Sequence, residues 1–189
     1  LTPALVVSVA SVVADESRFD QLTLAAVAQR LGVALPSLYK HVGGLDDLRR
    51  RMSVEALDEL GDALSRATVG RSRGDALRGL AGAYWEYAHA HPGRYAATLR
   101  SPAADDADAV ATTAHVLEVV YAVLAGYGIT DEDEGDATRM LRAVLHGYAV
   151  LESAGGFGTP RDIRRSFDRV IDALDAMFTD WSRPARRSG

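Results

Sequence analysis

The stretch TLAAVAQRLGVALPSLYKHVGGLDDL, residues 23–48, decides the fold predicted for this chain. Its pattern predicts two short helices separated by a tight turn, followed by the start of a third helix. Thr23 fits the N-cap of the first helix, and Leu22 and Val27 are placed as a hydrophobic staple around it. Gly32 stands where a glycine would end that helix. This spacing is that of a helix-turn-helix.

The second short helix is the most polar part of this stretch. Pro36 suits its first turn, because the missing N–H would have no partner within the helix there. Leu38 and Val42 form a small apolar face. The polar positions around that face are Ser37, Tyr39, Lys40 and His41. A helix this short gains little from its own burial, so we interpret it as a surface held out to a partner. On spacing alone, an ordinary three-helix packing unit remains the alternative.

Individual residues of the motif resemble the DNA-binding domain of TetR-family transcriptional repressors. The shared pattern is a glycine turn at 31–33, then LYKHV at 38–42, then Leu48 in the next helix. The resemblance is close over the first third of the chain and implies phosphate contacts from Tyr39 and His41. It also implies base contacts from the first residues of the second helix and from the residue between the tyrosine and the histidine, which are Pro36, Ser37 and Lys40 here. The DNA-binding residues predicted in this way are Thr23, Pro36, Ser37, Tyr39, Lys40 and His41. The family usually has a lysine where this chain has Leu45, so one phosphate anchor is missing and weaker binding is expected.

Composition excludes several classes of protein. With 48% hydrophobic and 25% charged residues, the 189-residue chain can bury a sizeable core. It has no cysteine, which excludes disulfide scaffolds, thiol catalysis and cysteine zinc sites. We see neither a signal peptide nor an uninterrupted apolar run of the ~18 residues that span a bilayer, and therefore predict a cytoplasmic protein without a membrane partner. Because the sequence begins at Leu1 rather than at methionine, we expect further residues upstream.

A net charge of −5 argues by itself against a nucleic-acid partner, but the charge is segregated along the chain. Between positions 21 and 51 the basic residues are Arg30, Lys40, Arg49, Arg50 and Arg51. Only Asp46 and Asp47 oppose them, so five minus two gives a local charge of +3. Lys40 is also the only lysine of the chain. We interpret this segment as a basic patch for DNA, with an ordinary solvated surface as the alternative.

Helical periodicity continues after the motif and predicts an all-α protein. The polar segment TVGRSRG, residues 68–74, is the clearest linker. The predicted organisation is a helix-turn-helix domain over 1–44, a connecting helix over 45–66, an effector-binding and dimerisation domain over 67–182 and a disordered tail over 183–189. In TetR-like proteins such a connecting helix joins two domains, so a shift at its far end can reorient the helix-turn-helix domain.

Two helices have predicted core faces. A first helix over 2–17 would turn Leu5, Val9, Val12 and Val13 inward. A later helix over 107–127 would place Val110, Ala114, Leu117, Tyr121 and Leu124 on one face. The second of these helices carries few charges, so we expect it to be buried on more than one side.

The last two helices are the predicted homodimer interface. The first becomes apolar nearly all round from Met140 to Leu151, and the second repeats apolar residues at helical spacing from Ile163 to Trp181. They are joined by the glycine turn at 155–158. Such a pair can meet its twofold mate as a four-helix bundle, as the TetR resemblance also implies. The alternative is that both helices are simply core.

Aromatic and histidine side chains among apolar helices predict a small-molecule site. The proposed effector-binding residues are Tyr84, Trp85, His89, His115, His146 and Tyr148. Segments 84–95 and 146–158 also resemble a TetR effector-domain subgroup with a Trp and a His-Gly motif. For any single histidine on an apolar helix, a satisfied core residue is the simpler interpretation.

We find no nucleotide-binding loop, nucleophile elbow or zinc-binding helix, and predict no cofactor, metal or enzymatic activity. The sequence therefore indicates a ligand-responsive regulator, expected to be a repressor, that a small molecule releases from a palindromic operator. Two alternatives remain: a helical scaffold with a non-functional helix-turn-helix, and an all-α enzyme using His146 or His89.

Overall fold

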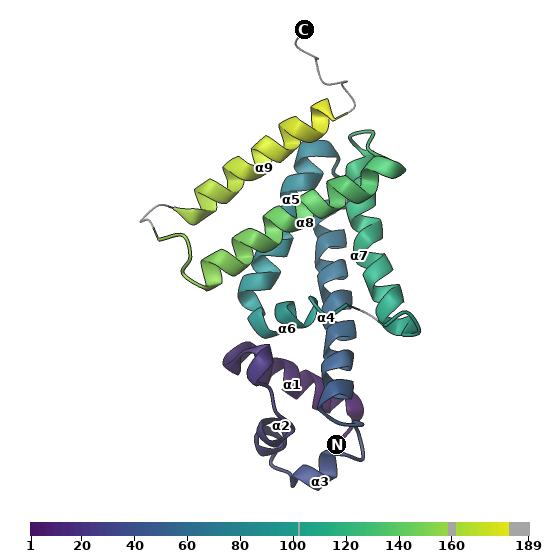
Figure 1. Ribbon diagram of the computed structural model, residues 1–189, viewed down its shortest axis with the longest axis vertical. Coiled ribbons are helices and arrows are strands. Elements are labelled where there is room, and N and C mark those ends of the chain that lie inside the picture. Colours follow the sequence, from purple (N-terminus) through teal and green to yellow (C-terminus); the bar gives the residue numbers. More distant parts are fainter. Residues whose placement is uncertain (102, 159–161, 182–189) are drawn as a thin grey trace. The chain divides into compact units, whose positions relative to one another are not determined.

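The computed structural model describes residues 1–101, 103–158 and 162–181 (Figure 1). Over these ranges the chain forms α-helices and one short 3₁₀ helix, with no strand, which confirms the all-α prediction. In chain order the elements are α1 (Pro3–Ser17), η1 (Phe19–Gln21), α2 (Leu24–Leu31), α3 (Leu35–Leu38), α4 (Leu45–Thr68), α5 (Arg73–Ala90), α6 (Pro92–Ala97), α7 (Ala107–Ala125), α8 (Glu132–Ser153) and α9 (Ile163–Asp180). The predicted disordered tail, 183–189, lies outside the described residues.

The chain forms two compact units. The first comprises residues 1–61 and 87–116, and the second begins with residues 62–86 and continues from residue 117. Helices α4, α5 and α7 each contribute residues to both units. These units are defined by packing, whereas the domains predicted above are functional, so that division stays a prediction.

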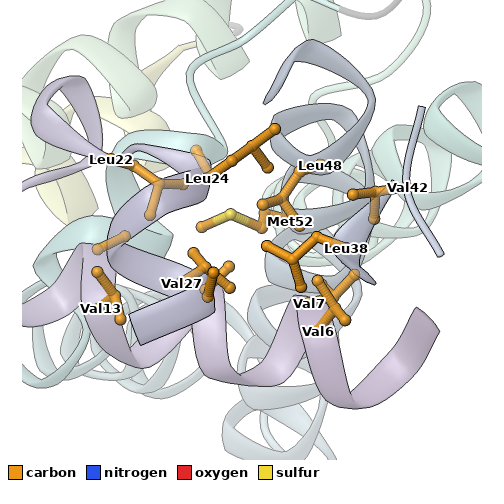
Figure 2. Packing of buried hydrophobic residues seen from close by; sticks show 14 of the residues in the cluster. Val6, Val7, Val13, Leu22, Leu24, Val27, Leu38, Val42, Leu48 and Met52 are labelled. Atoms are coloured by element: carbon orange, nitrogen blue, oxygen red, sulfur yellow. The ribbon is translucent and has the colours of Figure 1, made fainter. Parts of the chain in front are cut away.

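The core around the helix-turn-helix, in the first unit, is almost entirely aliphatic. Figure 2 shows side chains of α1, α2, α3 and the first turns of α4 pointing toward one another. The buried cluster consists of Val6, Val7, Ala10, Val13, Ala14, Leu22, Leu24, Val27, Ala28, Leu38, Val42, Leu48, Met52, Ala56 and Ala97. Small branched side chains let these short helices pack closely, so apolar burial holds the helix-turn-helix together.

Helix α2 begins and ends as its residues predict. The Thr23 hydroxyl accepts a hydrogen bond from the Ala26 N–H at 3.2 Å, which is an N-cap. At the other end Gly32 has φ 69° and ψ 28°, a left-handed conformation that a side chain would strain. The Val33 N–H bonds the Ala28 carbonyl at 3.0 Å, completing a Schellman motif. The turn of the helix-turn-helix is therefore encoded locally.

The second helix of the motif is shorter than predicted. The α-helix ends at Leu38, whereas we expected about two turns that included Tyr39 and His41. The chain nevertheless keeps turning, because the N–H groups of His41 and Val42 both bond the Leu38 carbonyl, at 2.8 and 3.0 Å. Leu38 and Val42 are buried, as predicted. A fully buried anchor thus holds a tight polar turn in place of a second helical turn.

Two predicted core faces were partly wrong. In α1 the side chains of Leu5 and Val12 are 47% and 37% exposed, and the buried face runs through Val6, Val7, Ala10, Val13 and Ala14 instead. In α7 Val110 is 45% exposed, so this helix is not buried on several sides. Both helices are apolar on most of their circumference, and periodicity alone cannot choose the inward side of such a helix.

Helix α7 is apolar over most of its length, although Asp108 and Glu118 interrupt the apolar run. Its 19 residues include a window with mean hydropathy 1.4, of which 17% is buried, so by length and composition it could cross a membrane. A core helix of a soluble protein meets the same criteria. Asp108 in its first turn forms an ion pair with Arg50 at 3.0 Å, which places a charged contact at that end of the helix.

In the second unit, α8 and α9 lie side by side and are joined by the turn around residues 154–158 (Figure 1). The inward face of α9 follows the predicted spacing and consists of Phe167, Ile171, Leu174 and Phe178. Helix α8 buries Ala137, Leu141, Leu145 and Ala149.

Candidate functional site

The surface predicted to bind DNA is built around the buried Leu38. Pro36, Tyr39 and Lys40 are exposed to solvent. Tyr39, a large aromatic residue, is 58% exposed. Ser37 and His41 are half-buried. Because these side chains are carried on one tight turn, α3 and the residues after it present hydroxyl, imidazole and ammonium groups on a rigid support.

Thr23 lies at the start of α2 and is exposed, but its hydroxyl already caps the helix. A side chain used in this way leaves the next backbone N–H groups of the first turn for an external acceptor. The positive end of the helix macrodipole also favours an anion there. The structural role of Thr23 is therefore established, and its contact with DNA stays a prediction.

The basic patch is less available than the local charge of +3 suggested. Arg30 forms an ion pair with Glu16, and the Arg51 guanidinium contacts Asp47, one turn earlier in α4, at 3.1 Å. The Gly43 N–H also donates to Asp47, at 2.8 Å. Burial raises the pKa of Asp47, but the Gly43 N–H and Arg51 lower it by more, so its pKa lies below the usual range.

The remaining arginines are engaged as well. Arg50 donates to Asp106 at 2.6 Å and to Asp108 at 3.0 Å, and these hydrogen bonds raise the pKa of the guanidinium. Arg49 donates to the backbone carbonyl oxygens of Asp20 and Leu22, at 3.3 and 3.4 Å, which fastens η1 to α4. Within the described residues, Lys40 and Arg49 are the patch cations without a carboxylate partner, and Arg49 is held by backbone carbonyl oxygens instead. Sequence counting missed this, because the carboxylates that engage Arg30 and Arg50 come from distant positions.

Two of the predicted effector-binding residues meet in the second unit. Trp85 on α5 and Tyr148 on α8 both pack against Phe167 of α9, with ring centroids 6.3 and 5.4 Å apart. Phe157, in the turn after α8, packs against Tyr148 with the two rings tilted and their centroids 5.1 Å apart. We call these four residues the aromatic cluster. Rings in contact at these distances contribute to packing beyond their buried area.

A matching family model and a relative settle the family. The model described as tetracyclin repressor-like, C-terminal domain, matches residues 77–174. The relative is an uncharacterised HTH-type transcriptional regulator of Mycobacterium tuberculosis, Rv0681, 40% identical over 169 residues, which cover 88% of this chain and 71% of the relative. The chain belongs to the TetR family. It is therefore a TetR-family transcriptional regulator.

Further similarities agree. The uncharacterised HTH-type transcriptional regulator YobS of Bacillus subtilis is 31% identical over 171 residues, covering 90% of this chain and 89% of YobS. A solved TetR variant from Acinetobacter baumannii, in complex with minocycline, superposes with a TM-score of 0.73, covering 97% of this chain and 99% of that one. At 19% identity, this structure shows that the TetR fold is shared.

Sequence reasoning missed two polar members beside the aromatic cluster of this TetR-family chain. The Trp85 indole N–H donates to Glu152 at 2.9 Å. The Arg164 guanidinium lies over the Trp85 ring, 4.8 Å from its centroid. The pair Tyr148 and Glu152 is spaced four residues apart and so shares one helix face, a signal that could have found the carboxylate.

The other predicted effector-binding residues are not part of the aromatic cluster. Tyr84 is buried and His146 half-buried in the second unit, where burial, and then Arg142, lower the pKa of His146. His89 is exposed and belongs to the first unit. His115, also in the first unit, packs so closely on α4 that a side chain at Gly61 would collide with it. Over the part of the chain that is described, no group of three or more His, Cys, Asp or Glu side chains could hold a metal.

Helix α6 is held against α1 by a polar clasp that the sequence did not reveal. The Asp15 carboxylate accepts hydrogen bonds from the N–H groups of Gly93 and Arg94, both at 2.9 Å, and so caps the start of α6. A side chain at Gly93 would collide with the backbone of Ala14. Arg94 also reaches Glu59 of α4, at 3.4 Å. This clasp connects α6 to two helices of the first unit.

Proposed function

We propose that this TetR-family regulator is a ligand-responsive repressor that acts in the cytoplasm and binds a palindromic DNA operator as a homodimer. The observation that supports DNA contact best is the exposed polar turn anchored by Leu38, with Lys40 unpaired within the described residues while the neighbouring arginines are engaged. In a helix-turn-helix the second helix enters the major groove. Tyr39 and His41 would contact phosphates, and Pro36, Ser37 and Lys40 would face bases, with Thr23 at the backbone.

The effector would bind through some or all of Tyr84, Trp85, His89, His115, His146 and Tyr148. Trp85 and Tyr148, which share Phe167 as a neighbour, are the pair whose contacts favour this role most. A small molecule releases DNA only if it binds better to a conformation in which the two helix-turn-helix domains of the dimer are wrongly spaced for the operator. The loss of DNA affinity then equals that difference in ligand affinity and cannot exceed it.

Footprinting of purified protein on the DNA flanking its own gene, at two salt concentrations, tests the DNA-binding proposal. We expect a two-fold symmetric protected site whose affinity falls steeply with salt, because phosphate contacts release counterions. The same DNA then allows effectors to be screened by release. A protein that protects no DNA even at low salt would favour the scaffold alternative.

Substitutions of the polar turn test which residues make the contacts. Lys40→Ala should relax base preference at one operator position by about 1–3 kcal/mol. Tyr39→Phe should instead weaken binding to all sequences alike, by about 0.5–1.5 kcal/mol, because it removes one hydrogen bond to phosphate. Arg139→Ala, at an 81% exposed position of α8, is the control and should change neither. If both test variants bound DNA as the wild type does, this turn would not be part of the DNA interface.

The proposed homodimer uses α8 and α9. Met140 and Leu151 of α8 are 37% and 47% exposed and lie about three turns apart, so they share one face. Leu151→Asp should convert the dimer to a monomer in sedimentation or light scattering at micromolar concentration. Val110→Asp, at an equally exposed apolar position of α7, should leave the dimer intact. A monomeric wild type would overturn the proposed interface.

A further inference from the structure

A small cavity lies in the first unit beside the start of α4. Its volume is about 170 Å³, well below the ~300–1,000 Å³ of sites for drug-sized ligands. Its lining consists of Asp46, Arg50, Ser53, Leu57, Arg100, Ser101, Ala103, Asp106 and Ala109. Two arginines and two aspartates thus line this space together with hydroxyl and apolar side chains, and one of the aspartates, Asp106, is already bonded to Arg50. None of the proposed effector-binding residues lines this cavity.

Ser53 is the unusual member of this lining. Its side chain belongs to a residue that is only 6% exposed, and within the described residues its hydroxyl makes no hydrogen bond. Other helical hydroxyls of this chain bond a carbonyl one turn earlier, as those of Ser17 and Thr68 do at 2.7 and 3.0 Å. The hydroxyl oxygen itself is not sealed from solvent, because the fully buried side-chain atoms without a partner are Arg49 Nε, Arg94 Nε and Thr138 Oγ1 within the described residues. The Ser53 hydroxyl is therefore available to a molecule in the cavity.

Arg100 supplies a charge that can be released at little cost. It contacts Asp46 through one hydrogen bond of 3.0 Å, and the Asp46 side chain is 86% exposed. An exposed ion pair of this kind contributes little to stability, so an incoming carboxylate can replace Asp46. Arg50 differs, because Asp106 holds it at 2.6 Å and Asp108 at 3.0 Å. Arg50 therefore keeps its carboxylate partners, whereas Arg100 can exchange Asp46 for the carboxylate of a ligand.

We propose that this cavity binds a short-chain carboxylate. The carboxylate would take the place of Asp46 on Arg100, and the Ser53 hydroxyl would donate a second hydrogen bond. The aliphatic chain would lie against Leu57 and Ala109, which are buried and apolar. The volume limits the ligand to a few carbon atoms. Because Asp46 is the second residue of α4, directly after the helix-turn-helix, binding would change the charge beside the DNA-reading motif.

The site can be tested on the full chain without DNA, so its failure and that of the proposed function are distinguishable. Saturation-transfer NMR would compare sodium butyrate with butanol and butylammonium chloride, at constant ionic strength. We expect saturable binding of butyrate in the millimolar range and none of the other two probes. Sodium chloride and sodium phosphate should compete weakly. Equal binding of all anions would show an exposed guanidinium rather than a carboxylate site and would overturn the proposal.

Variants assign the binding to the named residues. Arg100→Gln should weaken butyrate binding about tenfold or more, because it removes the charge-assisted contact. Ser53→Ala should weaken it several-fold, and Asp46→Asn should strengthen it by freeing Arg100. The exposed pair Arg139 and Asp136 in α8, also 3.0 Å apart, offers Arg139→Gln and Asp136→Asn as matched controls that should have no effect. Circular dichroism verifies folding of each variant. The site would be refuted if Arg100→Gln and Ser53→Ala both left butyrate binding unchanged. It would also be refuted if neither the wild type nor Asp46→Asn bound butyrate.

Discussion

The helix-turn-helix core and the aromatic cluster bury their residues in different ways. Around Leu38 the buried side chains are aliphatic, and the polar side chains proposed to bind DNA lie outside the core. Around Phe167 the rings of Trp85 and Tyr148 pack inside the second unit, where Glu152 accepts a hydrogen bond from Trp85. In the first region packing and proposed function use different residues, whereas in the second they use the same ones.

This difference explains why the DNA-binding surface is easier to predict from the sequence than the aromatic cluster. A polar residue beside an aliphatic core face can be assigned to the surface from periodicity alone. An aromatic residue on an apolar helix fits both a core and a ligand site, because both need rings and a few hydrogen bonds. Substitutions that separate packing from surface chemistry therefore test the comparison most directly.

The largest expected effect is on stability in the aromatic cluster. Phe167→Ala should destabilise the protein by about 3–5 kcal/mol, because Phe167 is 1% exposed and two rings lose their neighbour. Urea unfolding followed by fluorescence, to which Trp85 contributes, would measure this. Leu38→Ala, the matched change in the aliphatic core, should cost about 2–5 kcal/mol and also abolish DNA binding. A change below about 1 kcal/mol for Phe167→Ala would show that the cluster is not tightly packed.

A smaller effect is expected where the helix-turn-helix depends on a cap. Thr23→Ala should destabilise the first unit by about 0.5–2 kcal/mol, because the Ala26 N–H loses its acceptor. Thr2→Ala, which removes the matching cap of α1, should have an effect of similar size. Ser8→Ala, at an exposed position within α1, is the control. Thermal unfolding of the four proteins would be compared, and equal midpoints for Thr23→Ala and wild type would contradict the cap.

The smallest effect concerns pH at the start of α4. Because the folded pKa of Asp47 lies below its unfolded value of about 3.9, its stabilising contribution is present above that value. The contribution is lost as the pH falls through the lowered folded pKa. Asp47→Asn should therefore be less stable than wild type at neutral pH, by less than about 1 kcal/mol, and the difference should shrink in acid. Stability profiles from pH 7 to acid would show it, and a constant difference would assign the effect to packing.

The sequence by itself determined the all-α fold, the limits of α2 and the inward face of α9. These features depend on interactions between residues a few positions apart, such as the Thr23 cap, the left-handed Gly32 and the spacing of Phe167 and Phe178. It also identified the family, because the motif residues around Leu38 are local. The inward faces of α1 and α7 were not determined in this way, since apolar residues surround most of each helix.

Only the tertiary structure decided which charges and hydroxyls are available. Arg30 and Arg50 meet carboxylates that lie 14 and 56 residues away in sequence, so counting charges along the chain overestimated the basic patch. The same long-range packing leaves the Ser53 hydroxyl facing a cavity and brings Glu152 to Trp85. Electrostatic and hydrogen-bond partners are chosen by proximity in space, which local patterning does not encode.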